Sequence, residues 1–487
     1  MVHSRWSIAF ITAEIERVKV VDHWFLPASH HLFFALTPAN AYFTVMNIKH
    51  PLTFTALLCL SLFCVQPLWA QHSNLRKGAQ ELLNSQPLNQ AHVGICIYDP
   101  AKQQYWYQYQ DNKYFTPASN TKIFTLFTGL QMLGDSLPAL KYLETDSVLY
   151  VKGMGDPSFL HPDYISQPAM DLLTRTDKRI VLIPTVITNK RFGPGWSWSD
   201  FSDYYQPELN EWPVYGNVAR IKHHRDTISI TPPAFSYGGH FSWRVNDTLD
   251  EALTERDERS NTFSLQYAKR DTALLLAEVP YITGTLQDLA ARLQDTLHKP
   301  VTVAEQMPAV NAKAFTTLYS RPVDSLFTPM MHRSDNFFAE QTLMMSSARQ
   351  WDTISTQKVI DYVKQQYLQS LPDKPEWVDG SGLSRYNLFS PRDFVSVLTL
   401  MHKQYPEERL WAIFPTGGKG TLRNYYKEQF VHAKTGTLSG CVALSGYLVT
   451  KKGKTLVFSV LVNNHNGTST AVRRAVERFL TEVRNSN

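Results

Sequence analysis

Three short motifs, far apart in the chain, most constrain how this sequence can fold. They are Ser119-Asn-Thr-Lys122, Ser334-Asp-Asn336 and Lys434-Thr-Gly436. Together they supply a nucleophile, a lysine that can accept its proton, a bridging hydroxyl with an amide, and a cation for a carboxylate. If the three motifs serve one site, the fold must bring three distant segments into a single pocket.

The first motif sits at a predicted helix start. Pro117-Ala-Ser119 begins a stretch whose apolar residues keep to one helical face. Lys122 then lies one turn after Ser119 and on the same side, which brings the hydroxyl and the amine together. The helix dipole at this position would favour negative charge developing on the serine.

A free serine hydroxyl is a poor nucleophile, so Ser119 needs a base, and Lys122 is the candidate. An ordinary lysine titrates near ~10.4, and bringing its pKa to about 7 destabilises the charged form by about 4–5 kcal/mol. Partial burial and a second cation, Lys434, would both act in that direction. Ser334 is predicted to lie between the two amines and to relay a proton to the leaving nitrogen. Asn336 is predicted to hold Lys122 through its side-chain oxygen and to donate from its amide to the substrate.

The third motif is predicted to bind substrate, with Lys434, Thr435, Gly436 and Thr437 on one strand edge. Alternate residues of a strand share a face, so Thr435 and Thr437 should point together. Two hydroxyls and an ammonium suit a terminal carboxylate. The backbone N–H groups of Ser119 and Thr437 would form the oxyanion hole.

Each motif alone has an ordinary structural interpretation. Ser-x-x-Lys is commonly a helix cap, Ser334-Asp-Asn336 could also cap a helix, and Lys-Thr-Gly is usually a turn. Their order, the preceding Pro117-Ala and the β-rich sequence after Lys434 favour a joint catalytic role. The sequence shows neither a His-Glu-x-x-His pattern nor paired-cysteine metal spacing, so no metal and no cofactor are predicted. Cys96 and Cys441 are interpreted as small buried apolar residues on strands, with a disulfide between them as the alternative.

The charge balance excludes one class of partner. The formal net charge is +5, from 48 basic and 43 acidic residues. This excess is slight and spread along the chain without a basic run, so nucleic acid is not an expected partner.

The N-terminal sequence predicts export. Residues 46–70 have the polarity of a signal peptide, because Lys49 and His50 precede an uncharged stretch with an apolar centre. That centre is shorter than the ~20 residues that a membrane-spanning helix needs. We interpret residues 1–45 as an upstream extension before Met46, and we expect a periplasmic protein. An uncleaved anchor is the alternative, and peripheral membrane association is compatible with either.

The remaining sequence predicts an α+β protein in which one domain is split by an insert. Strands are expected at 93–98 and 105–110, and further strands at 442–449 and 455–462 precede a terminal helix at 471–483. These predict one antiparallel sheet assembled from both chain ends, with helices against it. The catalytic domain would comprise residues 71–145 and 313–487, and residues 146–312 would form a β-rich insert of one or more domains.

The motifs resemble those of the D-alanyl-D-alanine carboxypeptidases/endopeptidases of the penicillin-binding protein 4 type. This is the class C low-molecular-mass group of penicillin-binding proteins, serine peptidase family S13. The resemblance also covers Gly155-Asp-Pro-Ser158, residues 196–205, Asp379-Gly-Ser-Gly-Leu-Ser-Arg385 and Gly420-Thr-Leu422. It implies a penicillin-binding protein/β-lactamase-like serine transpeptidase domain, with the long segment after the first motif as a family insert.

The resemblance also implies a function. Ser119 would form an acyl-enzyme, Lys122 would accept its proton, and Lys434 would contact the substrate carboxylate. The expected substrates are peptidoglycan stem peptides ending in D-alanyl-D-alanine, or the cross-bridges between them, and β-lactam antibiotics should be covalent inhibitors. Two rivals remain: a β-lactamase or esterase on the same scaffold, and a catalytically idle envelope-binding protein.

Overall fold

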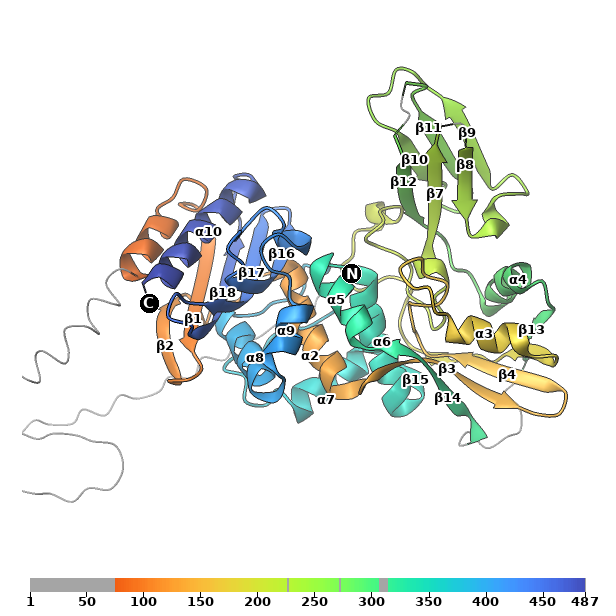
Figure 1. Ribbon diagram of the computed structural model, residues 1–487, viewed down its shortest axis with the longest axis horizontal. Helices are drawn as coiled ribbons and strands as arrows, with labels where there is room; N and C mark the ends of the chain where they lie inside the picture. The colour runs from red at the N-terminus through yellow and green to blue at the C-terminus, as the bar shows by residue number, and fades with distance from the viewer. Residues whose placement is uncertain (1–74, 226, 271–272, 306–313, 487) are drawn as a thin grey trace, which may run out of the picture. The chain divides into compact units, whose positions relative to one another are not determined.

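A five-stranded antiparallel sheet joins the two ends of the described chain (Figure 1). The computed structural model describes residues 75–486, with gaps at 226, 271–272 and 306–313. The sheet that was predicted from both chain ends is therefore confirmed. Its strands, in the order β16-β17-β18-β1-β2, are β16 (Val431–Leu438), β17 (Cys441–Val449), β18 (Thr455–Asn463), β1 (His92–Asp99) and β2 (Gln104–Tyr109).

Helices cover both faces of this sheet, which explains why β17 and β18 are almost continuously apolar. One face packs against residues 75–83, which are helical, and against α10 (Ser469–Asn485). The apolar residues of α10 recur at helical spacing and lie in the same hydrophobic cluster as the sheet. The other face packs against the helices that carry the first two motifs.

The helical layer on that second face forms the larger hydrophobic cluster. Phe124 of α2 lies at its centre, in contact with the rings of Trp377, Phe389 and Phe394. Ser390 caps α8, and Pro391 occupies its first turn. The helices of this layer are α2 (Lys122–Met132), α5 (Asp324–His332), α6 (Asn336–Trp351), α7 (Thr356–Gln366), α8 (Pro391–Gln404) and α9 (Glu407–Ile413).

The insert contains a second five-stranded sheet, in the order β13-β5-β4-β3-β14. This sheet extends beyond the predicted limits of 146–312 at both ends, because β3 and β14 pair with each other in antiparallel register. The elements are β3 (Ser136–Glu144), β4 (Val148–Gly153), α3 (Pro168–Arg175), β5 (Arg179–Leu182), α4 (Leu286–Leu297), β13 (Val301–Val303) and β14 (Thr316–Pro322).

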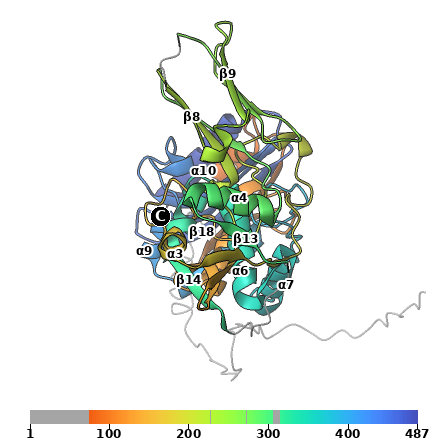
Figure 2. The same ribbon diagram turned by 90° about the vertical axis from the view of Figure 1, so that its right-hand side faces the viewer.

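Two three-stranded sheets, β12-β7-β8 and β10-β11-β9, complete the insert (Figures 1 and 2). Their shared core is small and includes Phe235, Phe263 and Tyr281. A separate two-stranded pair, β6 with β15, links the insert to the helical layer of the first sheet. These strands are β6 (Val186–Ile187), β7 (Val218–His224), β8 (Thr227–Thr231), β9 (Phe241–Val245), β10 (Leu253–Arg256), β11 (Phe263–Tyr267), β12 (Leu275–Pro280) and β15 (Thr353–Ile354).

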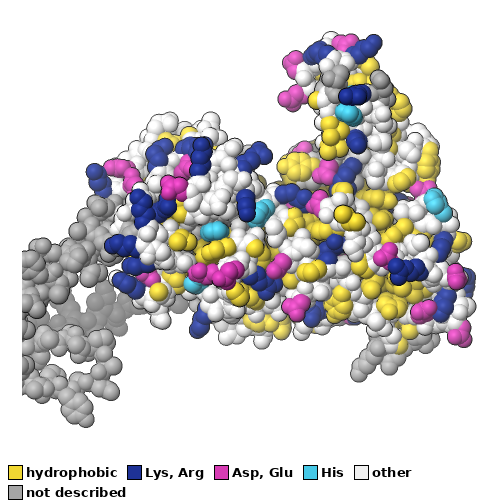
Figure 3. Space-filling model, in the orientation of Figure 1, with side chains coloured by type: hydrophobic (Ala, Val, Ile, Leu, Met, Phe, Trp, Pro, Cys, Tyr) yellow, Lys and Arg dark blue, Asp and Glu magenta, His cyan; other side chains and the backbone are white. Residues whose placement is uncertain are grey.

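Several other expectations can be compared with the structure. Cys96 and Cys441 are both buried and free, which confirms the preferred interpretation over a disulfide. Basic and acidic side chains are interspersed over the face shown in Figure 3, consistent with the even spread of charge along the chain. Within the described part of the chain, every helix is too short or too polar to cross a membrane. The predicted extension at 1–45 and signal peptide at 46–70 lie outside the described residues.

Candidate active site

The nucleophile candidate lies in a tight turn directly before helix α2. Ser119 belongs to the 3-10 turn η1 (Ala118–Thr121), and Lys122 is the first residue of α2. Ser119 thus lies at the N-terminal end of this helix, as predicted, in a 3-10 turn that precedes the α-helical residues. Ala118 has a φ of 48°, and the amide of Asn120 donates to the carbonyl of Pro117, so the chain tightens before the α-helical hydrogen bonds begin.

The Lys122 amine has three partners, which come from three parts of the chain. Nζ lies 2.9 Å from Ser119 Oγ, 2.7 Å from Asn336 Oδ1 and 2.7 Å from the carbonyl oxygen of Ser381. The Asn336 amide is fixed in this orientation because its Nδ2 donates to the carbonyl of Tyr205. A neutral amine has two hydrogens and one lone pair. With the hydrogens donated to Asn336 and Ser381, the lone pair is left for the Ser119 hydroxyl.

Burial controls the protonation of this amine. Lys122 is fully buried, and this lowers its pKa from 10.5 to about 8. The carboxylates of Asp379, Glu340 and Asp335 oppose the shift and raise the pKa. The balance leaves Lys122 close to the range in which a lysine serves as a general base near neutral pH.

The second and third motifs meet at Lys434. Its Nζ donates to Ser334 Oγ at 2.8 Å and to the carbonyl of Thr435 at 2.7 Å. Burial lowers the pKa of Lys434 well below the usual value, and the charges of Lys122 and Arg473 lower it further. Ser334 has a φ of 64° and directly precedes the Asp335 cap of α6. This conformation is uncommon outside glycine and fits a constrained site.

Close backbone contact explains two glycines beside the nucleophile. β16 is an edge strand of its sheet, and Gly436 faces the turn that carries Ser119. A Cβ at Gly436 would lie 2.6 Å from the carbonyl oxygen of Pro117. A Cβ at Gly382 would overlap the carbonyl oxygen of Ala118, and Gly382 has a φ of 78°. The turn is thus enclosed between β16 and the 379–385 loop.

The two threonines of the third motif have different surroundings. Both lie on the α10 side of β16, since their strand partners Leu444 and Val442 belong to the α10 cluster. Thr437 is exposed and lines the cavity in front of Ser119, whereas Thr435 is buried and lines a small apolar cavity instead. Thr437 Oγ1 accepts a hydrogen bond from the Arg473 guanidinium of α10. The structure thus brings Thr437 to the site, but not the Thr435 hydroxyl.

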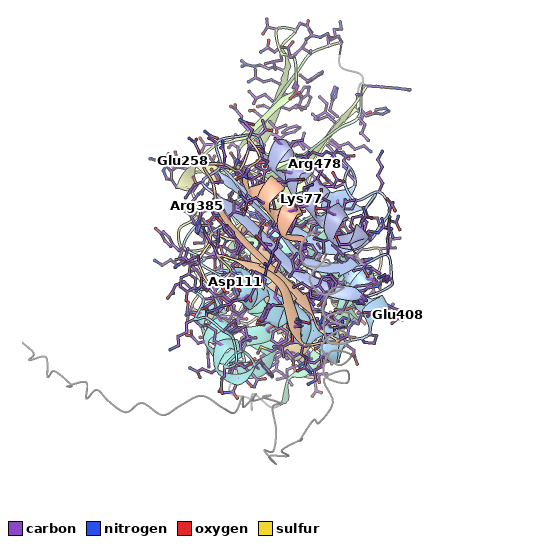
Figure 4. All side chains as sticks on the ribbon, turned by 90° about the vertical axis from the view of Figure 1, so that its left-hand side faces the viewer. Lys77, Asp111, Glu258, Arg385, Glu408 and Arg478 are labelled. Atoms are coloured by element: carbon purple, nitrogen blue, oxygen red, sulfur yellow. The ribbon has the colours of Figure 1, made fainter. Side chains whose placement is uncertain are left out.

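A cavity of about 680 Å³ opens in front of Ser119. Its walls include Ser334 and Asn336 from the second motif and Thr437 from β16, so the three motifs share one pocket. The insert contributes a polar and aromatic wall, and the 379–385 loop adds Arg385, which is labelled in Figure 4. The lining residues from the insert include Asp163, Ser197, Asp200, Tyr204 and Tyr205.

Other residues near Lys122 were not predicted as site residues. Glu340 of α6 is 1% exposed and binds the backbone of the 379–385 loop. Asp379 accepts from the amides of Gly382 and Ser384 and from Trp196 Nε1. In the sequence, the family resemblance covered residues 379–385 and 196–205, but it assigned no role to any residue of these segments.

These features define a serine–lysine acyl-transfer site. Ser119, Ser334 and Asn336 line one pocket of the size of a small-ligand site. The buried amine of Lys122 bonds to Ser119, the buried amine of Lys434 bonds to Ser334, and burial lowers the pKa of both amines. Within the described residues, no group of three or more histidine, cysteine or acidic side chains could hold a metal ion.

Comparison with known proteins places the chain in a family. Residues 75–483 match the family model described as the D-Ala-D-Ala carboxypeptidase 3 (S13) family. The match covers most of the chain, so the chain belongs to this family, and the resemblance inferred from the motifs is confirmed.

Curated relatives agree with this membership. The chain is 25% identical over 478 residues to "D-alanyl-D-alanine carboxypeptidase" of Actinomadura sp. (strain R39), with 85% of each chain covered. It is 22% identical over 426 residues to "D-alanyl-D-alanine carboxypeptidase DacB" of Haemophilus influenzae, covering 77% of this chain and 86% of that protein. It is also 22% identical over 455 residues to "Penicillin-sensitive carboxypeptidase A" of Dictyostelium discoideum, with coverages of 79% and 85%.

Among solved structures, penicillin binding protein 4 (dacB) from Haemophilus influenzae has a similar fold. The TM-score is 0.65 at 20% sequence identity, over 84% of this chain and 97% of that one. The same protein complexed with a β-lactam gives a TM-score of 0.59 at 19% identity, over 84% and 97% of the two chains. The predicted α+β penicillin-binding protein fold is therefore confirmed.

Proposed function

We propose that this protein is a serine D-alanyl-D-alanine carboxypeptidase that forms a covalent acyl-enzyme at Ser119. The observation that carries the proposal is the Lys122 amine, buried and 2.9 Å from Ser119 Oγ, with its other partners both acceptors. An amine in this setting is suited to remove the hydroxyl proton. Membership in a D-Ala-D-Ala carboxypeptidase family supports a substrate that ends in D-alanyl-D-alanine, and we infer that this substrate is a peptidoglycan stem peptide.

The reaction begins with proton transfer from Ser119 Oγ to Lys122 Nζ as Oγ bonds to the carbonyl carbon of the penultimate D-alanine. The backbone N–H groups of Ser119 and Thr437 stabilise the oxyanion, each donor contributing about 3–4 kcal/mol at the transition state. The C–N bond then breaks, and the Ser334 hydroxyl, which accepts from Lys434 at 2.8 Å, gives its proton to the leaving nitrogen. The proton that Lys122 took from Ser119 replaces it on Ser334, so Lys122 is neutral again for the second step. Terminal D-alanine leaves, and water hydrolyses the ester in a second, equivalent step.

The second buried cation gives the site its preference for an anionic substrate end. Lys434 donates to Ser334, and both Ser334 and Thr437 line the cavity. A terminal carboxylate bound here would receive charge-assisted hydrogen bonds. β-Lactams carry a carboxylate at a comparable distance from a strained amide, so they should acylate Ser119 as well. The curated relative named a penicillin-sensitive carboxypeptidase supports this extension.

The proposal extends to peptide cross-bridges as substrates and to a location outside the cytoplasmic membrane. Cleavage of peptide cross-bridges between stems would use the same acyl-enzyme, with a second stem as leaving group, and the cavity of about 680 Å³ leaves room for one. A peptidoglycan substrate requires the enzyme outside the cytoplasmic membrane, which agrees with the export signal expected at residues 46–70. We therefore propose that the protein is periplasmic. This location also allows peripheral association with the membrane.

The test is release of D-alanine from a synthetic stem peptide. Wild type should release D-alanine, and Ser119→Ala should release none above background, with unchanged far-UV circular dichroism. Equal release by both proteins would exclude the mechanism. No release by either would favour an idle envelope-binding protein. A fluorescent penicillin separates the remaining rival, because a β-lactamase would lose the adduct rapidly whereas a carboxypeptidase should keep it for many minutes.

A further inference from the structure

A buried carboxylate lies behind the lysine base and contacts the loop that orients it. Glu340 is on α6, one turn after Asn336, and is 1% exposed. Its two carboxylate oxygens accept from the backbone amides of Gly380 and Ser381, at 3.0 and 2.7 Å. The carbonyl of Ser381 is in turn one of the two acceptors of the Lys122 amine. The acidic side chain is thus linked to the base through a single residue of backbone.

The same peptide is held from the opposite side. Thr125 lies on α2, one turn after Lys122, and its Oγ1 donates to the carbonyl of Gly380 at 2.6 Å. A Cβ at Gly380 would lie 2.8 Å from the carbonyl oxygen of Ala339, so the loop passes directly against α6. The peptide that aims the Ser381 carbonyl is therefore fixed between two helices, each of which also carries a residue of the reaction site.

We propose that Glu340 is a positioning residue: its carboxylate holds the Gly380–Ser381 backbone so that the Ser381 carbonyl turns the Lys122 lone pair toward Ser119. The inference rests on the proposed function, because it assigns a role in the same acylation step. Asn336 fixes one hydrogen of the neutral amine, and Ser381 fixes the other. Release of either acceptor would allow the amine to rotate away from the hydroxyl.

Burial of the Glu340 carboxylate costs desolvation free energy, so another interaction must compensate for that cost. Replacing it by an apolar side chain would remove its desolvation penalty, yet two loop amides would be left without an acceptor. Burial raises the pKa of Glu340 to about 7, and the charge of Asp379 acts in the same direction. Glu340 and Asp379 line a cavity of about 460 Å³ together with Lys190. Above pH 7, Glu340 therefore carries charge while the Lys122 base becomes neutral.

That charge makes the role separable from a merely structural one. The groups facing Lys122 are Asp335 and Glu340 from α6, Asp379 from the loop and Lys434 from β16, and the three carboxylates raise its pKa. Neutralising Glu340 should lower the Lys122 pKa. The neutral base would then appear at lower pH, although it would be less well aimed.

The experiment measures the rate constant for acylation by benzylpenicillin between pH 6 and 10. Glu340→Gln should lower the plateau rate about ten-fold or more and move the acidic limb to lower pH. Thr125→Val removes the second clamp without changing charge, so it should lower the plateau and leave the limb in place. Thr125→Ser keeps the hydroxyl and should restore the plateau.

Asp393→Asn is the matched control for loss of a buried carboxylate. Asp393 accepts from the amides of Ser390 and Asp373, but it belongs to the α8 cap and has no link to Lys122. It should change stability without changing the acylation profile.

A folded Glu340→Gln protein with the wild-type profile would overturn the proposal, and so would a wild-type plateau in Thr125→Val. Should Glu340→Gln fail to fold, the Thr125→Val plateau decides alone. If wild type itself is not acylated at Ser119, the proposed function fails, and this is a different result from a variant that matches an active wild type.

Discussion

The acylation rate should follow the neutral fraction of a lysine whose pKa burial has lowered to about 8. On that basis about 1% of the amine is neutral at pH 6, about 10% at pH 7 and about half at pH 8. An ordinary lysine at 10.5 would be less than about 0.1% neutral at pH 7. Burial therefore increases the reactive form by a factor on the order of 10² at neutral pH, equivalent to about 3 kcal/mol.

The direction of the pH dependence follows from the lowered pKa of Lys122. Lys122 acts as a base only when it is neutral, so acylation should rise with pH through its lowered pKa and then level off. We expect about a fifty-fold rise between pH 6 and 8 and about a two-fold rise above pH 8, given a pKa of about 8. Stopped-flow fluorescence with a chromophoric β-lactam, at β-lactam concentrations below saturation, measures the acylation rate at each pH directly.

Replacing the base provides the companion measurement. Lys122→Met should lower the plateau by about 10²–10⁴-fold, the usual contribution of a general base. Lys152→Met is a matched control, because Lys152 of β4 is also a buried lysine but pairs with Asp352, the residue that ends α6. A rate that still rises ten-fold per pH unit from 8 to 10 would refute the depressed pKa. A rate in Lys122→Met within a few-fold of wild type would refute the role of the base.

Three further substitutions test separate parts of the site. Lys434→Ala should slow acylation by substrates with a free terminal carboxylate about 10–100-fold while changing that of their amides little, as seen by comparing kcat/KM for the pair. Gly436→Ala should lower kcat about 100-fold in a folded protein, because its Cβ would meet the carbonyl oxygen of Pro117 at 2.6 Å and push β16 away; wild-type kcat would contradict that contact. Asn336→Ala removes one acceptor of Lys122 and should lower the acylation plateau about ten-fold or more, and an unchanged plateau would show that this hydrogen bond does not orient the amine.

The sequence predicted the reaction residues better than it predicted their support. Ser119, Lys122, Ser334, Asn336 and Lys434 meet in the structure because each motif carries a chemical requirement that short patterns reveal. The central sheet was also predictable, since its inner strands are buried on both faces and therefore read as continuous apolar runs.

The residues that support the site could not be predicted from short sequence patterns. A glutamate within a helical pattern, such as Glu340, is usually exposed, and its burial depends on a loop that returns from about forty positions later in the chain. Thr435 and Thr437 share a strand face, as predicted, but only the structure shows that α10 covers the first of them. Strand periodicity gives the face of a residue and not the element that packs on it.

The limits of the insert show the same difficulty. β3 precedes the predicted insert in the sequence and β14 follows it, and these two strands pair although the whole insert separates them. No local sequence pattern encodes this contact. Residues 180–187 are one β-rich stretch in the sequence, yet they contribute to β5 and β6 in two different sheets. In both cases the pairing partner, set by tertiary packing, decided the boundary.

The most direct test of the account is the mass of the intact protein after incubation with benzylpenicillin, followed by peptide mapping. The account predicts one added penicilloyl group per chain, located on Ser119 and absent from Ser119→Ala. An adduct on any other residue, or no adduct while D-alanine is still released, would contradict the assignment of Ser119 as the nucleophile.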